Sequence, residues 1–463
     1  MSDPLDAVSP LDGRYASRTA PLRPFVSEAA LLRARARVEV EYLVALSDLE
    51  AVDLELDGDD RATCRGWYER FGGDDARRIK AIEVEGDADR PATNHDVKAV
   101  EYWLRDRLRA ADLERAVPWV HFGLTSEDVN NLAYRLLLVG AHADVLRPAI
   151  ERVRDQLAAE ARAHRDVPMP ARTHGQAASP TTYGKELAVF ADRLDRAIGR
   201  LDAAIDALGG KLGGATGTFA AHAVALPAVD WPAFAADFVE DLGLAYRPLT
   251  TQVNPNDDLA ALFDAYAGAA TVLLDLDTDM WRYVSDGYLV QAAAAGEVGS
   301  STMPHKVNPI DFENGEGNLG HARAALRFLA DDLPVSRLQR DLSDSTVSRT
   351  IGEALGRWLL GVEKTADGLD TVAPDAEAMA DDLAAEPAVL AEAVQTALRR
   401  VGDEAAYERV KAATRDVDVD AATFDDLIEA VAATDPALAE RLEALTPAAY
   451  TGLAAALVDE LDR

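Results

Sequence analysis

The sequence has 463 residues, a formal net charge of −34 at pH 7 and a single cysteine, Cys64. This length allows two or three domains with a large buried core. The negative charge argues against a nucleic-acid partner, because the phosphates would be repelled. One cysteine excludes an intrachain disulfide and is typical of a reducing compartment. With no visible signal peptide and no uncharged apolar run of about eighteen residues, we expect a cytoplasmic protein without a membrane span.

The acidic residues are spread along amphipathic segments, and lysine is scarce, since only seven of the 47 basic residues are Lys. Such a surface is typical of adaptation to high salt, where counter-ions screen the repulsion between carboxylates. A disordered acidic tail would instead place its acids in consecutive runs. The composition therefore favours a folded, halophilic protein.

Helical patterns follow one another through the first quarter of the chain. Residues 1–24 are interrupted by Pro and Gly, and apolar residues then recur at helical spacing over 27–50. A Gly- and Asp-rich break at 57–60 precedes a further helical stretch, and 93–102 opens another helix with an N-cap-type residue. We expect a first helical domain over residues 1–117.

The middle of the chain has the longest apolar stripes. Apolar residues step by three or four over 129–157 and again over 259–288. At 1.5 Å per residue the second helix would be roughly 45 Å long, a length typical of elongated bundles. We expect Pro148 to kink the first helix and 168–180 to connect two long helices. These patterns predict a central long-helix bundle over 118–370.

The remaining residues, 371–463, alternate short helical patterns with Asp, Pro and Gly breaks and predict a small C-terminal helical domain. The chain shows no internal repeat and no strong strand alternation. We therefore predict an all-α protein of three domains around a central elongated bundle. The apolar stripes are assigned to packing, although the pattern does not separate the core of one chain from contacts between subunits.

Polar residues that are unusual for their surroundings gather in a few loops and helix starts. These clusters are Asp12–Tyr15, Asn94–Asp96, His121–Asp128, Arg172–Gln176, Gly296–Pro309, Gln252 and Gln339–Arg349. Four of the eight histidines lie in them, namely His95, His121, His174 and His305. Simpler explanations remain open: Thr125 or Ser126 caps a helix, His174 is a satisfied loop histidine, and Arg340 forms a surface ion pair.

Several familiar sites have no pattern in this sequence. No His and carboxylate spacing is typical of a zinc or iron site, and no dinucleotide-binding or serine-hydrolase motif occurs. The glycine-rich stretch Gly209–Gly214 lacks the spacing and the hydroxyl of a phosphate-binding loop. The sequence therefore offers no pattern for any of these sites.

The segment Gly299–Asn308 reads Gly-Ser-Ser-Thr-Met-Pro-His-Lys-Val-Asn. It resembles the Gly-Ser-Ser-x-Met-Pro-x-Lys-x-Asn signature loop of the fumarase/aspartase superfamily. Three further stretches, Asp12–Tyr15, Thr93–Glu101 and Gln339–Arg349, narrow the resemblance to the adenylosuccinate lyase family in its longer bacterial-type form. The resemblance covers nearly the whole chain.

The resemblance implies a carbon–nitrogen lyase of purine biosynthesis that acts as a homotetramer with sites shared between subunits. It implies neither a metal nor an organic cofactor. The reaction would be β-elimination of fumarate from adenylosuccinate, giving AMP, and from the succinyl-aminoimidazole-carboxamide ribotide, giving AICAR. By correspondence Ser300 is the base, His174 the acid and Glu313 the carboxylate that orients His174. His95 corresponds to a second histidine that contacts the substrate and assists in proton handling. We expect closure of the signature loop to bring Lys306 and backbone N–H groups to the base and lower its effective pKa. Ser301 is the alternative base.

The remaining corresponding residues would bind substrate. The residues that would hold the nucleotide and its phosphate are Arg14, Tyr15, Arg340, Ser345, Thr346 and Arg349. Those that would surround the succinyl part are Thr125, Ser126, Gln252, Ser301, Lys306, Asn308 and Asn314. Val307 is a further substrate-binding residue, and Asn94 and Asp96 flank His95. Another fumarate-releasing lyase, such as argininosuccinate lyase, and a non-catalytic relative remain alternatives. The intact set Ser300, His174, Lys306 and Glu313 argues against the non-catalytic relative.

Overall fold

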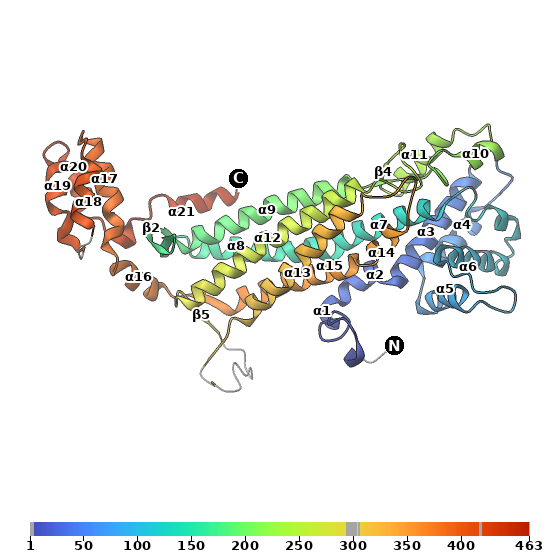
Figure 1. Cartoon of the computed structure of the whole chain (residues 1–463), viewed down its shortest axis with the longest axis horizontal. Helices are drawn as coiled ribbons and strands as arrows, with labels where there is room; N and C mark the ends of the chain where they lie inside the picture. The colour runs from blue at the N-terminus through green and yellow to red at the C-terminus, as the bar shows by residue number, and fades with distance from the viewer. Residues whose placement is uncertain (1–3, 293–302, 304–305, 416–418, 463) are drawn as a thin grey trace. The chain divides into compact units, whose positions relative to one another are not determined.

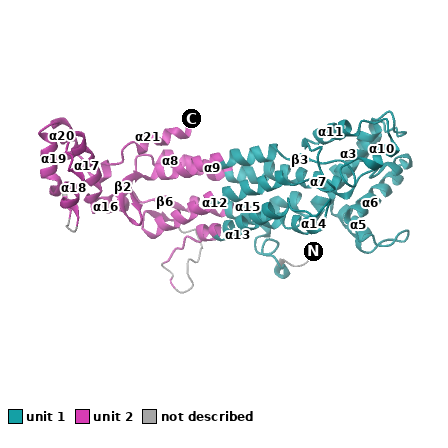
Figure 2. Cartoon of the chain, turned by 45° about the horizontal axis from the view of Figure 1, so that its top comes forward, with its two compact units in different colours: residues 1–150, 197–271, 317–362 teal, residues 151–196, 272–316, 363–463 magenta. Residues whose placement is uncertain are grey.

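The computed structural model of the chain describes residues 4–292, 303, 306–415 and 419–462. The chain divides into two compact units (Figure 2). Unit 1 consists of residues 1–150, 197–271 and 317–362, and unit 2 consists of residues 151–196, 272–316 and 363–463. The division into domains 1–117, 118–370 and 371–463 stays a prediction.

Helices dominate the described residues, as the sequence predicted (Figure 1). In the first part of unit 1 they are α1 (Ala16–Thr19), α2 (Arg23–Val26), α3 (Glu28–Ser47), α4 (Gly58–Glu69), α5 (Gly73–Val84), α6 (Asp96–Ala110) and α7 (Ser126–Ala141). Later in the chain unit 1 adds α10 (Ala220–Ala225), α11 (Trp231–Asp241) and α14 (Ser343–Ser348). The long helices with residues in both units are α8 (Arg147–Ala163), α9 (Tyr183–Asp206), α12 (Asp257–Ser285), α13 (Ile310–Asp332) and α15 (Ile351–Thr371).

The N-terminal core of unit 1 forms around α3. The helix starts at Ser27, whose Oγ accepts a hydrogen bond from the N–H of Ala30 at 3.1 Å. Its apolar face packs with α4, α5 and α6 in one buried cluster that includes Leu43, Ile79 and Trp103. The helical stretch expected after residue 57 is two helices, α4 and α5, rather than one. This packing fixes the start of α6, which matters for the site.

The predicted irregularity at Pro148 lies just before that residue. Helix α7 passes into a short π-helical segment, His142–Leu146, and α8 continues from Arg147. Proline has no N–H for the preceding turn, so a local change in hydrogen bonding is its usual effect. Within this segment the His142 ring is buried and its Nδ1 lies 2.8 Å from the Tyr266 hydroxyl.

Helix α12 has 29 residues, close to the length that the apolar stripe predicts. Within the described residues it is also the one helix long and apolar enough to cross a membrane, a candidate the sequence analysis did not expect. Of its most apolar window 56% is buried inside the structure, and a bundle's core helix passes the same test. The helices pack closely in unit 2, where a Cβ on Gly315 would lie 2.3 Å from an oxygen of buried Asp277.

Strands are short and few among the described residues. Unit 1 has the parallel pair β3 (Gly209–Gly210) and β4 (Ala245–Tyr246). Unit 2 has the antiparallel pairs β1 (Pro168–Thr173) with β2 (Gln176–Thr182), and β5 (Leu289–Gln291) with β6 (Val372–Pro374). The segment expected as a plain connection at 168–180 is therefore a β-hairpin. Unit 2 ends with α16 (Ala376–Ala384), α17 (Ala391–Arg400), α18 (Ala406–Thr414), α19 (Asp425–Ala432), α20 (Pro436–Glu443) and α21 (Ala454–Leu457).

Candidate active site

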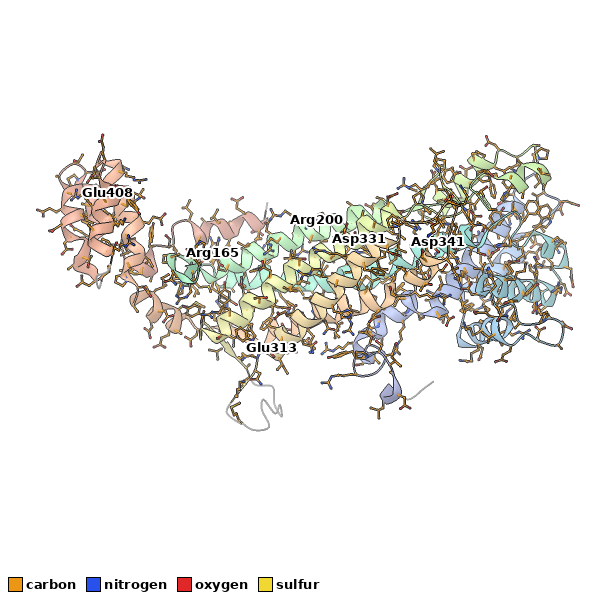
Figure 3. The ribbon with its side chains drawn as sticks, viewed as in Figure 1. Arg165, Arg200, Glu313, Asp331, Asp341 and Glu408 are labelled. Carbon is orange, nitrogen blue, oxygen red and sulfur yellow. The ribbon has the colours of Figure 1, made fainter. Side chains whose placement is uncertain are left out.

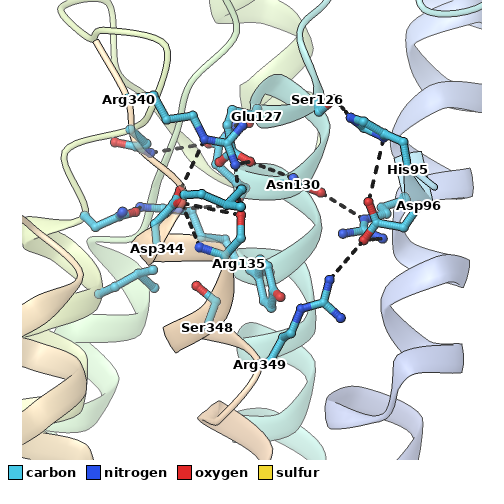
Figure 4. A pocket seen from close by; sticks show the side chains of 18 of the residues that line it. His95, Asp96, Ser126, Glu127, Asn130, Arg135, Arg340, Asp344, Ser348 and Arg349 are labelled. Atoms are coloured by element: carbon cyan, nitrogen blue, oxygen red, sulfur yellow. Dashed lines mark hydrogen bonds and ion pairs between the residues drawn. The ribbon is translucent and has the colours of Figure 1, made fainter. Parts of the chain in front are cut away.

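Unit 1 contains a polar cavity of about 250 Å³ (Figure 4). Side chains from α3, the start of α6, α7, the segment before α12 and the segment around α14 line it. Its lining includes the predicted residues Asn94, His95, Asp96, Ser126, Arg340, Ser345 and Arg349. Residues of three predicted clusters, Asn94–Asp96, His121–Asp128 and Gln339–Arg349, thus meet in one place.

His95 is itself the N-cap of α6. Its ring Nδ1 accepts the N–H of Lys98 at 3.2 Å. Because Nδ1 accepts, the neutral ring carries its proton on Nε2, which lies 3.5 Å from the Ser126 hydroxyl (Figure 4). Asn94 precedes it with φ of 48°, a left-handed conformation that asparagine tolerates in turns. The cap therefore fixes both the tautomer and the direction of the imidazole.

Asp96 is held in its charged form at the edge of the cavity. Its Oδ2 lies 2.9 Å from Nη1 of buried Arg35 and 3.6 Å from Nη2 of Arg349. Burial on its own would raise the pKa of Asp96, but the Arg35 guanidinium, the N–H of Val97 and Arg349 together outweigh it, so that pKa lies below its ordinary value. Arg349, exposed on one side, keeps donors free for a ligand.

Arg340 forms the opposite wall. The Nη2 of Arg340 lies 2.9 Å from Oε1 of Glu127 and donates a hydrogen bond to the Ser345 hydroxyl at 2.9 Å. Burial raises the pKa of Glu127, although Arg340 opposes this shift. Next to this wall Arg135 donates two hydrogen bonds to Asp258, at 3.1 and 2.7 Å. The cavity thus carries several guanidinium groups, the donors best suited to phosphate and carboxylate.

Helix α7 is anchored below the cavity by a buried ion pair. Asp128 accepts from the N–H groups of Thr125, Gly213 and Gly214, and its Oδ1 lies 2.7 Å from Nζ of Lys211. The glycine-rich stretch around Lys211 is therefore a structural support for the start of α7. It holds Thr125 in place as the N-cap of α7.

Other predicted residues lie in unit 2. His174 is the first of two residues at the tip of the β1–β2 hairpin, with φ of 54°, followed by Gly175 with φ of 74°. Two consecutive positive φ values are typical of a type I′ turn, which leaves the His174 side chain exposed. In the first turn of α13 Glu313 accepts a hydrogen bond from Nε1 of Trp281 at 3.2 Å (Figure 3 labels Glu313).

The signature loop is described only in part. Ser300, Ser301 and His305 lie outside the described residues, and the assignment of Ser300 as the base stays a prediction. Lys306 and Val307 are exposed, and the N–H of Lys306 donates to the carbonyl of Met303 at 3.0 Å. Asn308 and Asn314 are half-buried in the same unit.

Five predicted residues of unit 1 are not among those that line the cavity: Arg14, Tyr15, Thr125, Gln252 and Thr346. Arg14 and Tyr15 lie next to each other before α1, with the guanidinium 5.9 Å from the ring centre. Their assignment to substrate stays a prediction. Among the described residues no three His, Cys, Asp or Glu side chains cluster as metal ligands would.

Several residues of the cavity were not predicted from the sequence. Arg35, Glu127, Asn130, Arg135 and Asn254 all line it and are buried. Their signal was weak: a charged or amide side chain inside a helical apolar pattern usually faces solvent. Adjacent Asn130 and Asn131 were the better hint, because asparagine is a poor helix former.

Comparison with known proteins gives the same family that the motifs suggested. Residues 33–323 match a family model described as lyase, and residues 336–451 match one described as adenylosuccinate lyase C-terminal. The chain is 43% identical over 462 residues to adenylosuccinate lyase of Escherichia coli strain K12, covering 99% of each chain. The chain belongs to the adenylosuccinate lyase family. It is also 42% identical over 460 residues to the adenylosuccinate lyase of Dictyostelium discoideum, covering 97% of each chain.

Solved structures of other lyases and cyclising enzymes share the fold of this adenylosuccinate lyase family member. A fumarate lyase from Mesorhizobium sp. BNC1 matches with a TM-score of 0.71 at 21% identity, covering 95% of this chain and 96% of the other. A 3-carboxy-cis,cis-muconate lactonizing enzyme from Pseudomonas putida matches with a TM-score of 0.71 at 22% identity, covering 95% of both. The predicted all-α fold, the family and the class of carbon–nitrogen lyase are therefore confirmed.

Proposed function

We propose that the chain is an adenylosuccinate lyase that releases fumarate from adenylosuccinate to give AMP, and from the succinyl-aminoimidazole-carboxamide ribotide to give AICAR. The observation that carries this proposal is 43% identity over 99% of both chains to a curated enzyme of that name. A chance or fold-level likeness does not extend over entire sequences at this identity. The cytoplasm and a high-salt interior are the proposed setting.

The charges of the cavity support an anionic substrate. Adenylosuccinate carries one phosphate and two carboxylates, and this protein as a whole is strongly negative. Local guanidinium groups must therefore overcome an unfavourable overall field. Arg340 with Ser345, and Arg349, supply such donors in unit 1. A bound phosphate would replace Asp96 as the partner of Arg349.

The proposed reaction needs a base and an acid. Ser300 takes the proton from the carbon next to a carboxylate, and the electron pair left behind forms the double bond of fumarate. The carbon–nitrogen bond breaks as His174 gives a proton to the departing nitrogen, with Glu313 orienting its ring. Lys306 and loop backbone N–H groups would stabilise the serine alkoxide and the charge that develops on the substrate.

A homotetramer in which several subunits contribute to each site is part of the proposal. It accounts for predicted residues distributed between unit 1, such as His95, and unit 2, such as His174. Light scattering coupled to size exclusion measures the mass of the assembly directly. A monomer with full activity would contradict shared sites.

The activity is tested with purified protein and two substrates. The ultraviolet absorbance change is followed on adding adenylosuccinate and, separately, argininosuccinate, in low and high KCl. We expect turnover of adenylosuccinate alone, and a loss of several orders of magnitude in kcat for Ser300→Ala with substrate binding largely retained. Turnover of argininosuccinate instead would overturn the substrate, and full activity of Ser300→Ala would move the base to Ser301.

A further inference from the structure

An unbroken line of polar side chains runs through the wall of the unit 1 cavity. Arg35 lies 2.9 Å from Asp96 on one side, and its Nε donates to Oδ1 of Asn130 at 2.9 Å on the other. Asn130 then donates through Nδ2 to Oε1 of Glu127 at 2.6 Å. Glu127 lies 2.9 Å from Arg340 (Figure 4 labels Asp96, Asn130, Glu127 and Arg340). We call these five residues, Asp96–Arg35–Asn130–Glu127–Arg340, the polar chain.

The donors and acceptors of the polar chain can be arranged in only one way. Arginine only donates and an ionised carboxylate only accepts, so the Asn130 amide must turn its oxygen to Arg35 and its nitrogen to Glu127. The three middle members are buried, with 4%, 9% and 7% of Arg35, Asn130 and Glu127 exposed. Water therefore has little access to replace a lost partner, and displacement of one member leaves its neighbour unsatisfied.

The polar chain links four segments that are distant in sequence. Asp96 begins α6 directly after His95, Arg35 lies on α3, Asn130 and Glu127 lie on α7, and Arg340 precedes α14. Both ends are residues predicted to meet substrate, whereas the three middle members were not predicted. We propose that Arg35 and Asn130 are positioning residues that couple anion binding at Arg340 to the placement of Asp96 and His95.

The electrostatics give the coupling a cause. An anion that takes donors of Arg340 weakens its attraction for Glu127, whose pKa is already raised by burial. Glu127 then depends more strongly on Asn130, and the Asn130 amide in turn fixes the Arg35 fork. Since Arg35 also holds Asp96, the end of the cavity that carries His95 responds to occupation of the other end. This inference rests on the proposed function for the identity of the anion.

The experiment measures AMP binding by calorimetry to the full-length chain in KCl solution. Asp96→Asn alters one end and Arg340→Lys the other, alone and together, in the natural background and in an Asn130→Ala background. In the natural background we expect the combined loss of affinity to differ from the product of the single losses by about fivefold or more. In Asn130→Ala we expect agreement with the product to within about twofold.

Direct attraction between the two ends does not mimic this result, because it persists in both backgrounds. The matched control is Asn256→Ala, which removes an amide from the same cavity wall. Asn256 accepts from Arg135 at 3.2 Å and is not a member of the polar chain. In the Asn256→Ala background the combined loss of affinity should still differ from the product of the single losses. If Asn130→Ala does not fold, Arg35→Lys keeps the buried charge beside Asp96 but loses the forked contact, and serves instead.

If the combined loss of affinity differs from the product of the single losses equally with and without Asn130, the coupling is overturned. If this difference disappears in the Asn256→Ala background as well, the route through the polar chain is overturned, because general loosening of the cavity would then explain the result. If the natural chain does not bind AMP at all, the proposed function fails and this inference with it. Binding of AMP with unchanged coupling overturns this inference alone.

Discussion

Lys211 and Asp128 form a fully buried ion pair, with Nζ and Oδ1 2.7 Å apart and neither side chain exposed. Lys211 also donates to the carbonyl of Gly214 at 3.0 Å. Asp128 accepts from the backbone N–H of Thr125 at the start of α7 and from that of Gly213 in the glycine-rich segment. Burial lowers the pKa of Lys211, although Asp128 opposes the shift. The pair joins the start of α7 to the glycine-rich segment and thereby supports one wall of the cavity.

Removing one partner should leave an uncompensated buried charge. We expect Lys211→Met to lower the free energy of unfolding by about 3–5 kcal/mol, measured by urea denaturation. The control is Lys80→Met, since the Lys80 side chain is 41% exposed and pairs with Glu28 at the surface. That variant should lose at most about 1 kcal/mol. Equal losses for the two variants would contradict the structural importance of the buried pair.

Trp281 should tune the proposed acid through Glu313. Trp281→Phe keeps an aromatic ring and removes the Nε1–H that donates to Glu313 at 3.2 Å. We expect kcat for adenylosuccinate to fall about two- to tenfold with KM nearly unchanged, because the lost contact orients a catalytic group. The same substitution at half-buried Trp67, which packs against the N-terminal core, should leave kcat unaltered. A rise in KM alone would assign Trp281 to substrate binding.

His121 predicts a pH dependence of stability. Burial on its own lowers the pKa of His121, but Glu39, 2.5 Å from its Nδ1, and then Glu101 outweigh burial, so this pKa is raised above 6.5. A raised folded pKa contributes stability that is complete below the unfolded pKa and is lost as pH rises through the folded value. The difference in unfolding free energy between the natural chain and His121→Asn should therefore be larger at pH 6 than at pH 9.

The negative charge of Glu39 is the main cause of the raised pKa of His121, and a second variant tests it. Glu39→Gln keeps the shape of the side chain and removes its charge. Urea denaturation of His121→Asn in the Glu39→Gln background should show a smaller change between the two pH values. If the difference in unfolding free energy between the natural chain and His121→Asn is larger at pH 9 than at pH 6, His121 does not have a raised pKa in the folded chain.

Long periodic elements and capping residues could be predicted from the sequence, whereas paired side chains could not. The stripe over 259–288 predicted α12 because one face of a long helix must be apolar. The hairpin of β1 and β2 gave no strand alternation, since Pro168, Pro170 and Pro180 and a register shift interrupt it. Proline conceals the element that carries His174.

The cavity shows the same division between local and distant information. Asn94-His95-Asp96 was found because a polar trio opens a helix, and that signal is local. Arg33, Arg35 and Arg37 alternate along α3, and only Arg35 is buried. Their sequence neighbourhood is nearly the same, so the difference comes from partners 61 or more residues away, Asp96 and Asn130. A pairing of this kind depends on how helices pack.

Cys64 should be unreactive in the folded chain. Burial, aided by Asp60, raises the pKa of the thiol to about 11, although Arg115 opposes the shift. At pH 8 only about one thiol in a thousand would be ionised, and the thiolate is the reactive form. We expect slow labelling by a disulfide reagent at pH 8 and complete labelling in guanidinium chloride. A thiol introduced by Ser17→Cys, at an exposed position, should react at once in the folded protein; equally fast labelling of Cys64 would contradict its burial.

The net charge of −34 predicts that salt stabilises this protein. The screening length falls from about 10 Å at 0.1 M to about 3 Å at 1 M, so carboxylates on neighbouring helices repel one another far less. The folded chain holds those carboxylates closer together than the unfolded chain does, and screening therefore favours the folded state. We expect Tm to rise between 0.1 M and 2 M KCl, and activity to rise with it. Sorbitol at the same osmolality is the control, because it is excluded from the surface without screening charge. A Tm that rises equally in sorbitol, or falls in KCl, would mean that the acidic surface is not an adaptation to salt.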